Sequence, residues 1–181
     1  MFAGPNGSGK STIIRYLLPH QIGIYLNADD LEQQLRVNQR LDLKTYHSSL
    51  SAPALLHFLK SKSKLKDGIT TPLLSAHTIV GHSNTLQFDV IDLAARIIDY
   101  IRFKFLGLKI SFTFETVMSH QSKIDFLAQA QAQGFRTYLY YVATVDPQIN
   151  IGRVQTGGHI VPEHKIVERY HRSLSLLMSA N

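Results

Sequence analysis

Near its N-terminus the chain reads Gly4-Pro5-Asn6-Gly7-Ser8-Gly9-Lys10-Ser11. The spacing Gly-x-x-x-x-Gly-Lys-Ser is that of the P-loop, a turn that wraps backbone N–H groups around a phosphate. Its glycines allow the positive φ angles that such a turn needs, and a helix expected to begin near Lys10 adds its positive N-terminal end. The alternative is a glycine-rich turn before an ordinary helix. The apolar residues 1–3 that precede the loop favour the phosphate site instead.

The polar residues of the loop have expected roles in binding a nucleoside triphosphate, taken as ATP with Mg²⁺. Lys10 can place its ammonium on the β- and γ-phosphates, and the Ser11 hydroxyl can ligate the Mg²⁺ ion. Thr12 supplies a second hydroxyl. The expected nucleotide-binding residues are Gly4, Pro5, Asn6, Gly7, Ser8, Gly9, Lys10, Ser11 and Thr12.

The composition indicates a soluble globular protein. Of the 181 residues, 44% are hydrophobic and 18% are charged, which is ordinary for such a chain. The absence of cysteine excludes disulfides and thiol catalysis, and it fits a reducing compartment. No apolar run reaches the length of a membrane span, and the loop begins too early to leave room for a signal peptide. We therefore expect a cytoplasmic protein with no membrane partner.

The net charge of +6 raises the question of a nucleic-acid partner. The basic residues are scattered, apart from a short lysine run over residues 60–66 that is typical of a solvated linker. A triphosphate site itself needs positive charge, which accounts for part of the excess. The net charge slightly favours a nucleic-acid partner, but because the basic residues are scattered we do not expect nucleic acid as the main partner.

Segments with the pattern of β-strands alternate along the chain with segments that have the pattern of helices. We expect strands at 1–3, 23–26, 108–116 and 137–142. We expect helices at 11–18 (ended by Pro19), 31–37, 54–62, 89–107, 121–133 and 146–154, and a last helix that opens at Pro162. This order predicts an α/β fold, a three-layer sandwich with a mostly parallel central sheet, of the P-loop NTPase or kinase type. We expect one domain over 1–181, with a substrate-side insertion over residues 40–88 and a lid over 153–162.

Two carboxylates follow expected strands, at the sheet edge where ligands of α/β proteins gather. Asp29 can orient and deprotonate an acceptor hydroxyl, although it shares with Asp30 the alternative of capping a helix. We favour catalysis for Asp29 and capping for Asp30. Glu115 can hold a second substrate hydroxyl or a Mg²⁺-bound water, and its alternative is an idle surface carboxylate.

Missing motifs narrow the class of P-loop protein. The chain has no Asn-Lys-x-Asp sequence for guanine and no ABC-type signature, and it is too short for an AAA module with its lid. A small P-loop kinase remains, which transfers phosphate to a hydroxyl acceptor. Two alternatives stay open: a nucleotide-binding regulatory ATPase, in which Asp29 positions water, and a nucleic-acid end kinase.

Arginines near the C-terminal loop can stabilise transition-state charge when a lid closes. Arg153 precedes the Gly157-Gly158 pair, and Arg169 shares one face of the last expected helix with Lys165 and Arg172. That face is equally well explained as solvated surface. We select Arg153 and Arg169 as the catalytic arginines.

Four blocks in this order resemble the zeta-toxin family of P-loop kinases. They are residues 3–12, residues 26–31, residues 112–117, and residues 157–163 together with Arg169-Tyr170. The best-known members of that family are toxins of toxin–antitoxin pairs that use ATP and Mg²⁺ to phosphorylate UDP-N-acetylglucosamine. The resemblance therefore implies a nucleotide sugar as the acceptor and an antitoxin protein as a partner.

The resemblance also implies roles for individual residues. Lys10 and Ser11 match the nucleotide and Mg²⁺ positions, and Asp29 matches the acidic residue that activates the sugar hydroxyl. Glu115, followed by Thr116, matches the strand end near the substrate. Arg153 and Arg169 match the basic residues over the γ-phosphate. The chain departs from the family in a short segment between Arg153 and Gly157, which leaves no second lid arginine, and in residues 40–88, which resemble nothing in the family.

Overall fold

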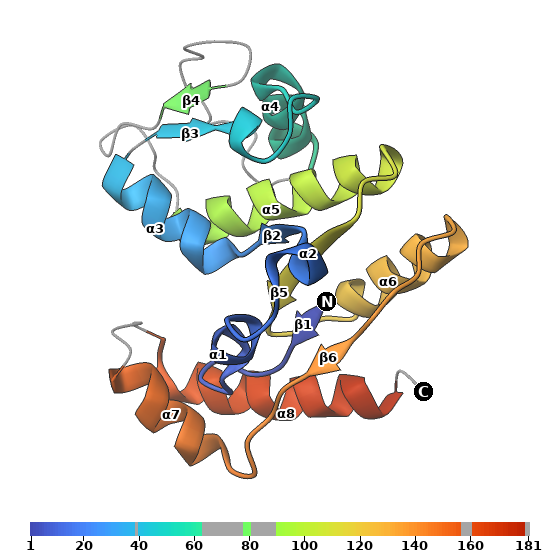
Figure 1. Cartoon of the computed structure of the whole chain (residues 1–181). Helices are drawn as coiled ribbons and strands as arrows, with labels where there is room; N and C mark the ends of the chain where they lie inside the picture. The colour runs from blue at the N-terminus through green and yellow to red at the C-terminus, as the bar shows by residue number, and fades with distance from the viewer. Residues whose placement is uncertain (39, 63–77, 81–89, 157–160, 180–181) are drawn as a thin grey trace. The chain divides into compact units, whose positions relative to one another are not determined.

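The computed structural model describes residues 1–38, 40–62, 78–80, 90–156 and 161–179 (Figure 1). The chain divides into two compact units, one made of Met1–Tyr25 with Ser111–Asn181 and the other of Leu26–Ile110. The glycine-rich loop and Glu115 belong to the first unit, whereas Asp29 belongs to the second. The expected insertion over 40–88 falls within the second unit, and residues 157–160 of the expected lid lie outside the described residues.

A four-stranded sheet lies in the first unit, except for Leu26, the last residue of one strand, which belongs to the second unit. The strands of the sheet are β1 (Phe2–Ala3), β2 (Ile24–Leu26), β5 (Phe112–Thr116) and β6 (Tyr140–Tyr141), in the order β2-β5-β1-β6. The short strand β1 runs parallel to both neighbours, with Phe2 opposite Glu115 of β5 and Tyr140 of β6. The predicted α/β fold with a parallel sheet is confirmed. Because β5 is the neighbour of β1, the end of β5 lies beside the start of the loop.

Five described helices belong to this unit. They are α1 (Lys10–Ile14), α2 (Pro19–Ile22), α6 (Ser122–Ala132), α7 (Pro147–Thr156) and α8 (Glu163–Ser179). The prediction of one helix over 11–18 is wrong. The amides of Tyr16 and Leu17 bond to carbonyls only three residues back, which tightens the chain out of the α-helix after Ile14. Pro19 then opens α2, because its fixed φ suits the first residues of a helix.

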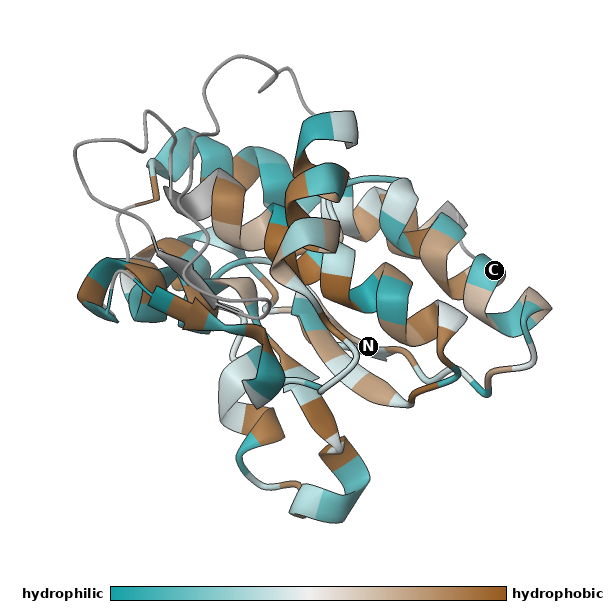
Figure 2. Ribbon diagram, turned by 90° about the horizontal axis from the view of Figure 1, so that it is seen from above, coloured by the Kyte–Doolittle hydropathy of each residue, from teal (hydrophilic) through white to brown (hydrophobic). Residues whose placement is uncertain are grey.

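The long C-terminal helix α8 is fastened to the chain segments that follow two strands. The Tyr170 hydroxyl donates to the Thr144 carbonyl at 2.8 Å, and the Ser173 hydroxyl donates to the Val117 carbonyl at 2.7 Å. Ile166 of α8 packs against Ile151 and Val154 of α7. Hydrophobic and hydrophilic residues alternate around the helices (Figure 2), as expected where one face of a helix is buried. Helices α7 and α8 therefore share a small hydrophobic core.

The second unit contains three described helices and a small antiparallel sheet. The helices are α3 (Ala28–Asn38), α4 (Ala52–Lys62) and α5 (Val90–Gly107), and the strands are β3 (Arg40–Asp42) and β4 (Thr78–Val80), with a 3₁₀ turn at Leu43–Thr45. Leu41 of β3 pairs with Ile79 of β4. The hydrophobic core of this second unit includes the fully buried residues Leu41, Leu55 and Phe105. In the described ranges, no helix is both long enough and apolar enough to cross a bilayer.

Candidate functional site

At two of its glycines the loop has no room for a side chain. Gly4 and Gly7 have φ angles of 141° and 74°. A Cβ atom at Gly4 would lie 1.9 Å from the Val142 carbonyl oxygen, and one at Gly7 would lie 2.5 Å from that of Asn150. The loop is therefore pressed against the end of β6 and against α7, with no room for side chains on that side. Such a turn leaves backbone N–H groups to line a concave surface that suits an anion.

Lys10 is buried inside this loop. Its side-chain ammonium donates to the carbonyl oxygens of Gly4 at 2.8 Å and Pro5 at 2.9 Å, and the residue is 5% exposed. The same ammonium lies 3.7 Å from Oε1 of Glu115. Because α1 covers only Lys10–Ile14, the expected contribution of the helix end is small, and Lys10 is the main fixed charge of the loop.

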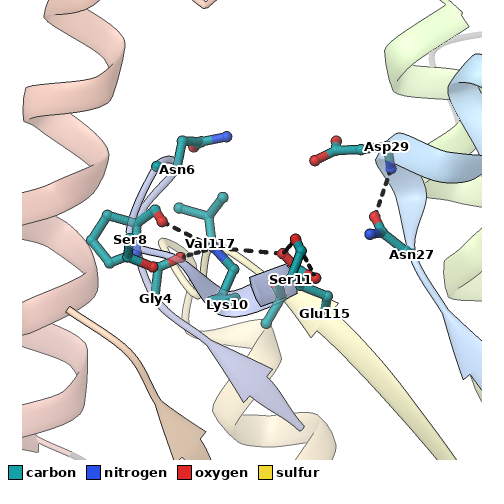
Figure 3. A network of polar contacts seen from close by, with 12 residues as sticks. Gly4, Asn6, Ser8, Lys10, Ser11, Asn27, Asp29, Glu115 and Val117 are labelled. Atoms are coloured by element: carbon teal, nitrogen blue, oxygen red, sulfur yellow. Dashed lines mark hydrogen bonds and ion pairs between the residues drawn. The ribbon is translucent and has the colours of Figure 1, made fainter. Parts of the chain in front are cut away.

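Glu115 meets the loop at the end of β5 (Figure 3). The Ser11 hydroxyl donates to its carboxylate, at 3.2 Å from each oxygen. The Tyr25 hydroxyl donates to Oε2 at 2.6 Å. Since the Ser11 proton points at Glu115, the lone pairs of the Ser11 oxygen are available to a cation. Glu115, at the end of β5, therefore lies beside the Ser11 hydroxyl, which the sequence predicts to bind the metal ion.

Two buried polar atoms of the loop have no hydrogen-bond partner within the part of the chain that the structure describes. They are the Ser8 hydroxyl and Oδ1 of Asn6. Buried polar atoms almost always have partners, because losing water without a replacement is costly. A phosphate oxygen in the loop would provide an acceptor for the Ser8 hydroxyl.

Helix α7 holds the loop from its other side. Asn150 is fully buried, and its side-chain amide donates to the Asn6 carbonyl at 2.6 Å while its Oδ1 accepts from the Thr144 hydroxyl. One turn further along, Nη1 of Arg153 lies 3.4 Å from the Gly7 carbonyl oxygen. The guanidinium of this predicted catalytic arginine is therefore at the rim of the loop.

Tyr25 and Asn150 are the two site residues that the sequence does not predict. Asn150 lies in the helix expected over residues 146–154, but its burial beside Ile151 emerges only from the structure. Tyr25 gives no signal in the sequence either, because a tyrosine in a strand is ordinary.

The remaining predicted residues are less closely placed. Arg169 is half-buried on α8, and no hydrogen bond or ion pair joins it to residues 4–12 in the described structure. The Thr116 carbonyl accepts from the Gly4 amide at 3.2 Å, and its hydroxyl accepts from the Met118 amide at 3.2 Å. These contacts hold the backbone at the start of the loop and after β5. Thr12 is exposed on α1.

Asp29 lies in the first turn of α3, in the second unit. Its amide donates to Oδ1 of Asn27 at 2.9 Å, so Asn27 supplies the cap of this helix. The prediction that Asp30 is the cap is therefore wrong: Asp30 sits within the first turn, where its charge suits the helix dipole.

No group of three or more His, Asp or Glu side chains that could hold a metal ion occurs among the residues whose positions are described. Comparison of the chain with protein-family models, with curated proteins and with solved structures gave no match. What the protein does is therefore inferred from the geometry of the loop and its neighbours.

Proposed function

We propose that this protein binds ATP with Mg²⁺ in the loop and transfers the γ-phosphate to a hydroxyl of a small acceptor. It would then be a P-loop kinase with a three-layer α/β fold, similar to the zeta-toxin family. The observation that carries the proposal is the meeting of Lys10, Ser11 and Glu115 at one loop, with the Ser11 hydroxyl bonded to the carboxylate at 3.2 Å. A cation, a hydroxyl and a carboxylate so placed are what a Mg²⁺-bound polyphosphate requires.

The residues of the loop fit a phosphate chain. Gly4 and Gly7 let the loop pack closely against the chain at Val142 and Asn150. Lys10 supplies a buried positive charge, and the Ser8 hydroxyl lacks a hydrogen-bond partner among the described residues. Arg153 adds a second positive charge at the rim. In the transition state, charge spreads over the transferred phosphoryl group, so Lys10 and Arg153 would stabilise it.

The residues also fit Mg²⁺. This ion keeps most of its waters and binds through one or two protein groups together with the phosphates, so a cluster of three carboxylates is not required. Ser11 would be the direct ligand, and Glu115 would orient Ser11 and accept from a metal-bound water. When bound, the ion neutralises charge on the β- and γ-phosphates.

For the acceptor we propose that Asp29 serves as the general base, because it follows strand β2 and its carboxylate is exposed. UDP-N-acetylglucosamine is the acceptor that the family resemblance suggests, and an antitoxin protein is the partner. The test is to incubate the protein with γ-labelled ATP, Mg²⁺ and a panel of acceptors. Label in UDP-N-acetylglucosamine supports the proposal, label only in free phosphate supports a regulatory ATPase, and label on a 5′-hydroxyl oligonucleotide supports a nucleic-acid end kinase.

Asp29→Asn is expected to lower phosphoryl transfer by roughly 10²-fold while ATP affinity stays within about twofold, because the amide cannot take a proton. Asp30→Asn is the matched control, since it removes the neighbouring charge, and it should keep most of the activity. Transfer rates and ATP dissociation constants of both variants make the comparison. An equal loss of transfer and ATP affinity in Asp29→Asn would assign Asp29 a structural role instead.

A further inference from the structure

We propose that Tyr25 is a positioning residue for the metal, because its phenol holds the Glu115 carboxylate in the orientation that Ser11 needs. This inference rests on the proposed function, which it deepens by naming a residue that sets the Mg²⁺ requirement. It begins from a single carboxylate that faces three groups: the Tyr25 hydroxyl at 2.6 Å, the Ser11 hydroxyl at 3.2 Å and the Lys10 ammonium at 3.7 Å.

The shortest of these contacts is to Tyr25, and it is made to the oxygen further from the lysine. Tyr25 bonds Oε2, whereas the ion-pair distance to Lys10 is measured to Oε1. The ammonium of Lys10 meanwhile donates to the carbonyls of Gly4 and Pro5 at shorter distances. The Tyr25 hydroxyl thus holds the Glu115 carboxylate toward β2, and the distance from this carboxylate to the Lys10 ammonium remains 3.7 Å.

This separation matters for binding a metal-bound nucleotide. Lys10 must face phosphates, and a close ion pair with Glu115 would compete with them for its charge. Ser11 must keep its proton directed at Glu115 so that its lone pairs face the ion. Without the phenol, the carboxylate gains freedom to turn toward Lys10, and both conditions weaken. Groups that orient metal ligands in this way commonly change metal affinity by about tenfold or more when removed.

A purely structural role for Tyr25 makes a different prediction. The Tyr25 bond joins β2 to β5, and the Thr113 hydroxyl of β5 donates at 2.7 Å to the carbonyl of Ile22, the last residue of α2, two residues before β2 begins. If the phenol only stabilised the sheet, its loss would lower thermal stability and would affect ATP binding equally with and without metal.

The experiment compares Tyr25→Phe with Tyr140→Phe, a control that removes a hydroxyl from strand β6, far along the same sheet from β2. Tyr140 is 52% exposed and its ring stacks on Phe2, a contact that phenylalanine keeps. ATP binding is measured by titration calorimetry in chelator and over a range of Mg²⁺ concentrations. We expect Tyr25→Phe to raise the half-saturating Mg²⁺ concentration by about tenfold. Metal-free ATP affinity and melting temperature should stay near wild type, and Tyr140→Phe should change nothing.

Glu115→Gln separates failure of this inference from failure of the proposed function. If Glu115→Gln raises the Mg²⁺ requirement and Tyr25→Phe does not, the Tyr25 inference is overturned and the proposed site stands. If Tyr25→Phe weakens metal-free and metal-bound ATP equally, Tyr25 is structural and the inference also fails. If the wild-type protein binds no ATP at any Mg²⁺ concentration, the proposed function fails and the inference falls with it.

Discussion

Lys10→Ala is expected to lower phosphoryl transfer by roughly 10³-fold, because it removes a buried cation from the centre of the proposed phosphate site. The ammonium lies within 3 Å of two loop carbonyls and is 5% exposed, so no other charge of the loop is equally well placed. Arg153 stands at the rim, 3.4 Å from the Gly7 carbonyl, and is exposed. It can compensate only in part. Steady-state transfer of label from γ-labelled ATP gives the rate.

The fold should survive this substitution. Glu115 keeps the Ser11 and Tyr25 hydroxyls as donors when Lys10 is lost, so its carboxylate is not left without partners. The Gly4 and Pro5 carbonyls do lose their ammonium donor, so the melting temperature should fall modestly while the variant stays folded. Lys104→Ala, which removes an exposed cation from α5 in the other unit, is the control and should leave transfer intact. An unchanged transfer rate in Lys10→Ala would remove the loop from the active site.

The sequence predicts the parts of this site but not how the sheet joins them. The glycine spacing and the strand pattern before Glu115 are local signals, and both lead to elements that the structure contains. That Glu115 reaches Ser11 depends on β5 lying beside β1, a pairing between residues over a hundred positions apart. Periodicity alone does not rank the possible strand orders. The sequence therefore does not decide whether Glu115 faces a substrate hydroxyl or a Mg²⁺-bound water, and the structure places it beside the Ser11 hydroxyl.

Local signals failed where tertiary contacts decide the outcome. Helix α1 ends at Ile14, although the residues up to Leu18 have good helical character, because the chain tightens to reach Pro19. Asn27 caps α3 in place of Asp30. Both residue types are good helix caps, so the sequence does not show which of the two is used. Asn150 supports the loop from a helix with only a weak pattern, so its role emerges only from the contact with Asn6.

Gly7→Ala is expected to weaken ATP binding by roughly 100-fold, or about 2.7 kcal/mol. The new methyl group would lie 2.5 Å from the Asn150 carbonyl oxygen, and that oxygen belongs to the backbone of α7, which cannot simply rotate away. The loop must therefore shift, which displaces the backbone N–H groups that we propose bind the phosphates. The residue also keeps a φ of 74°, which is strained for alanine.

Gly134→Ala separates the strain from the collision, because Gly134 has a φ of 86° and nothing within 4 Å of its added Cβ. Both variants should lose about 1–2 kcal/mol of unfolding free energy from the positive φ angle. Only Gly7→Ala should lose ATP affinity, which titration calorimetry measures alongside chemical denaturation. If both variants bind ATP as tightly as the wild type, the contact between Gly7 and Asn150 does not shape the phosphate site. Equal weakening in both would instead trace the loss to general destabilisation, since residue 134 follows α6 and lies outside the loop.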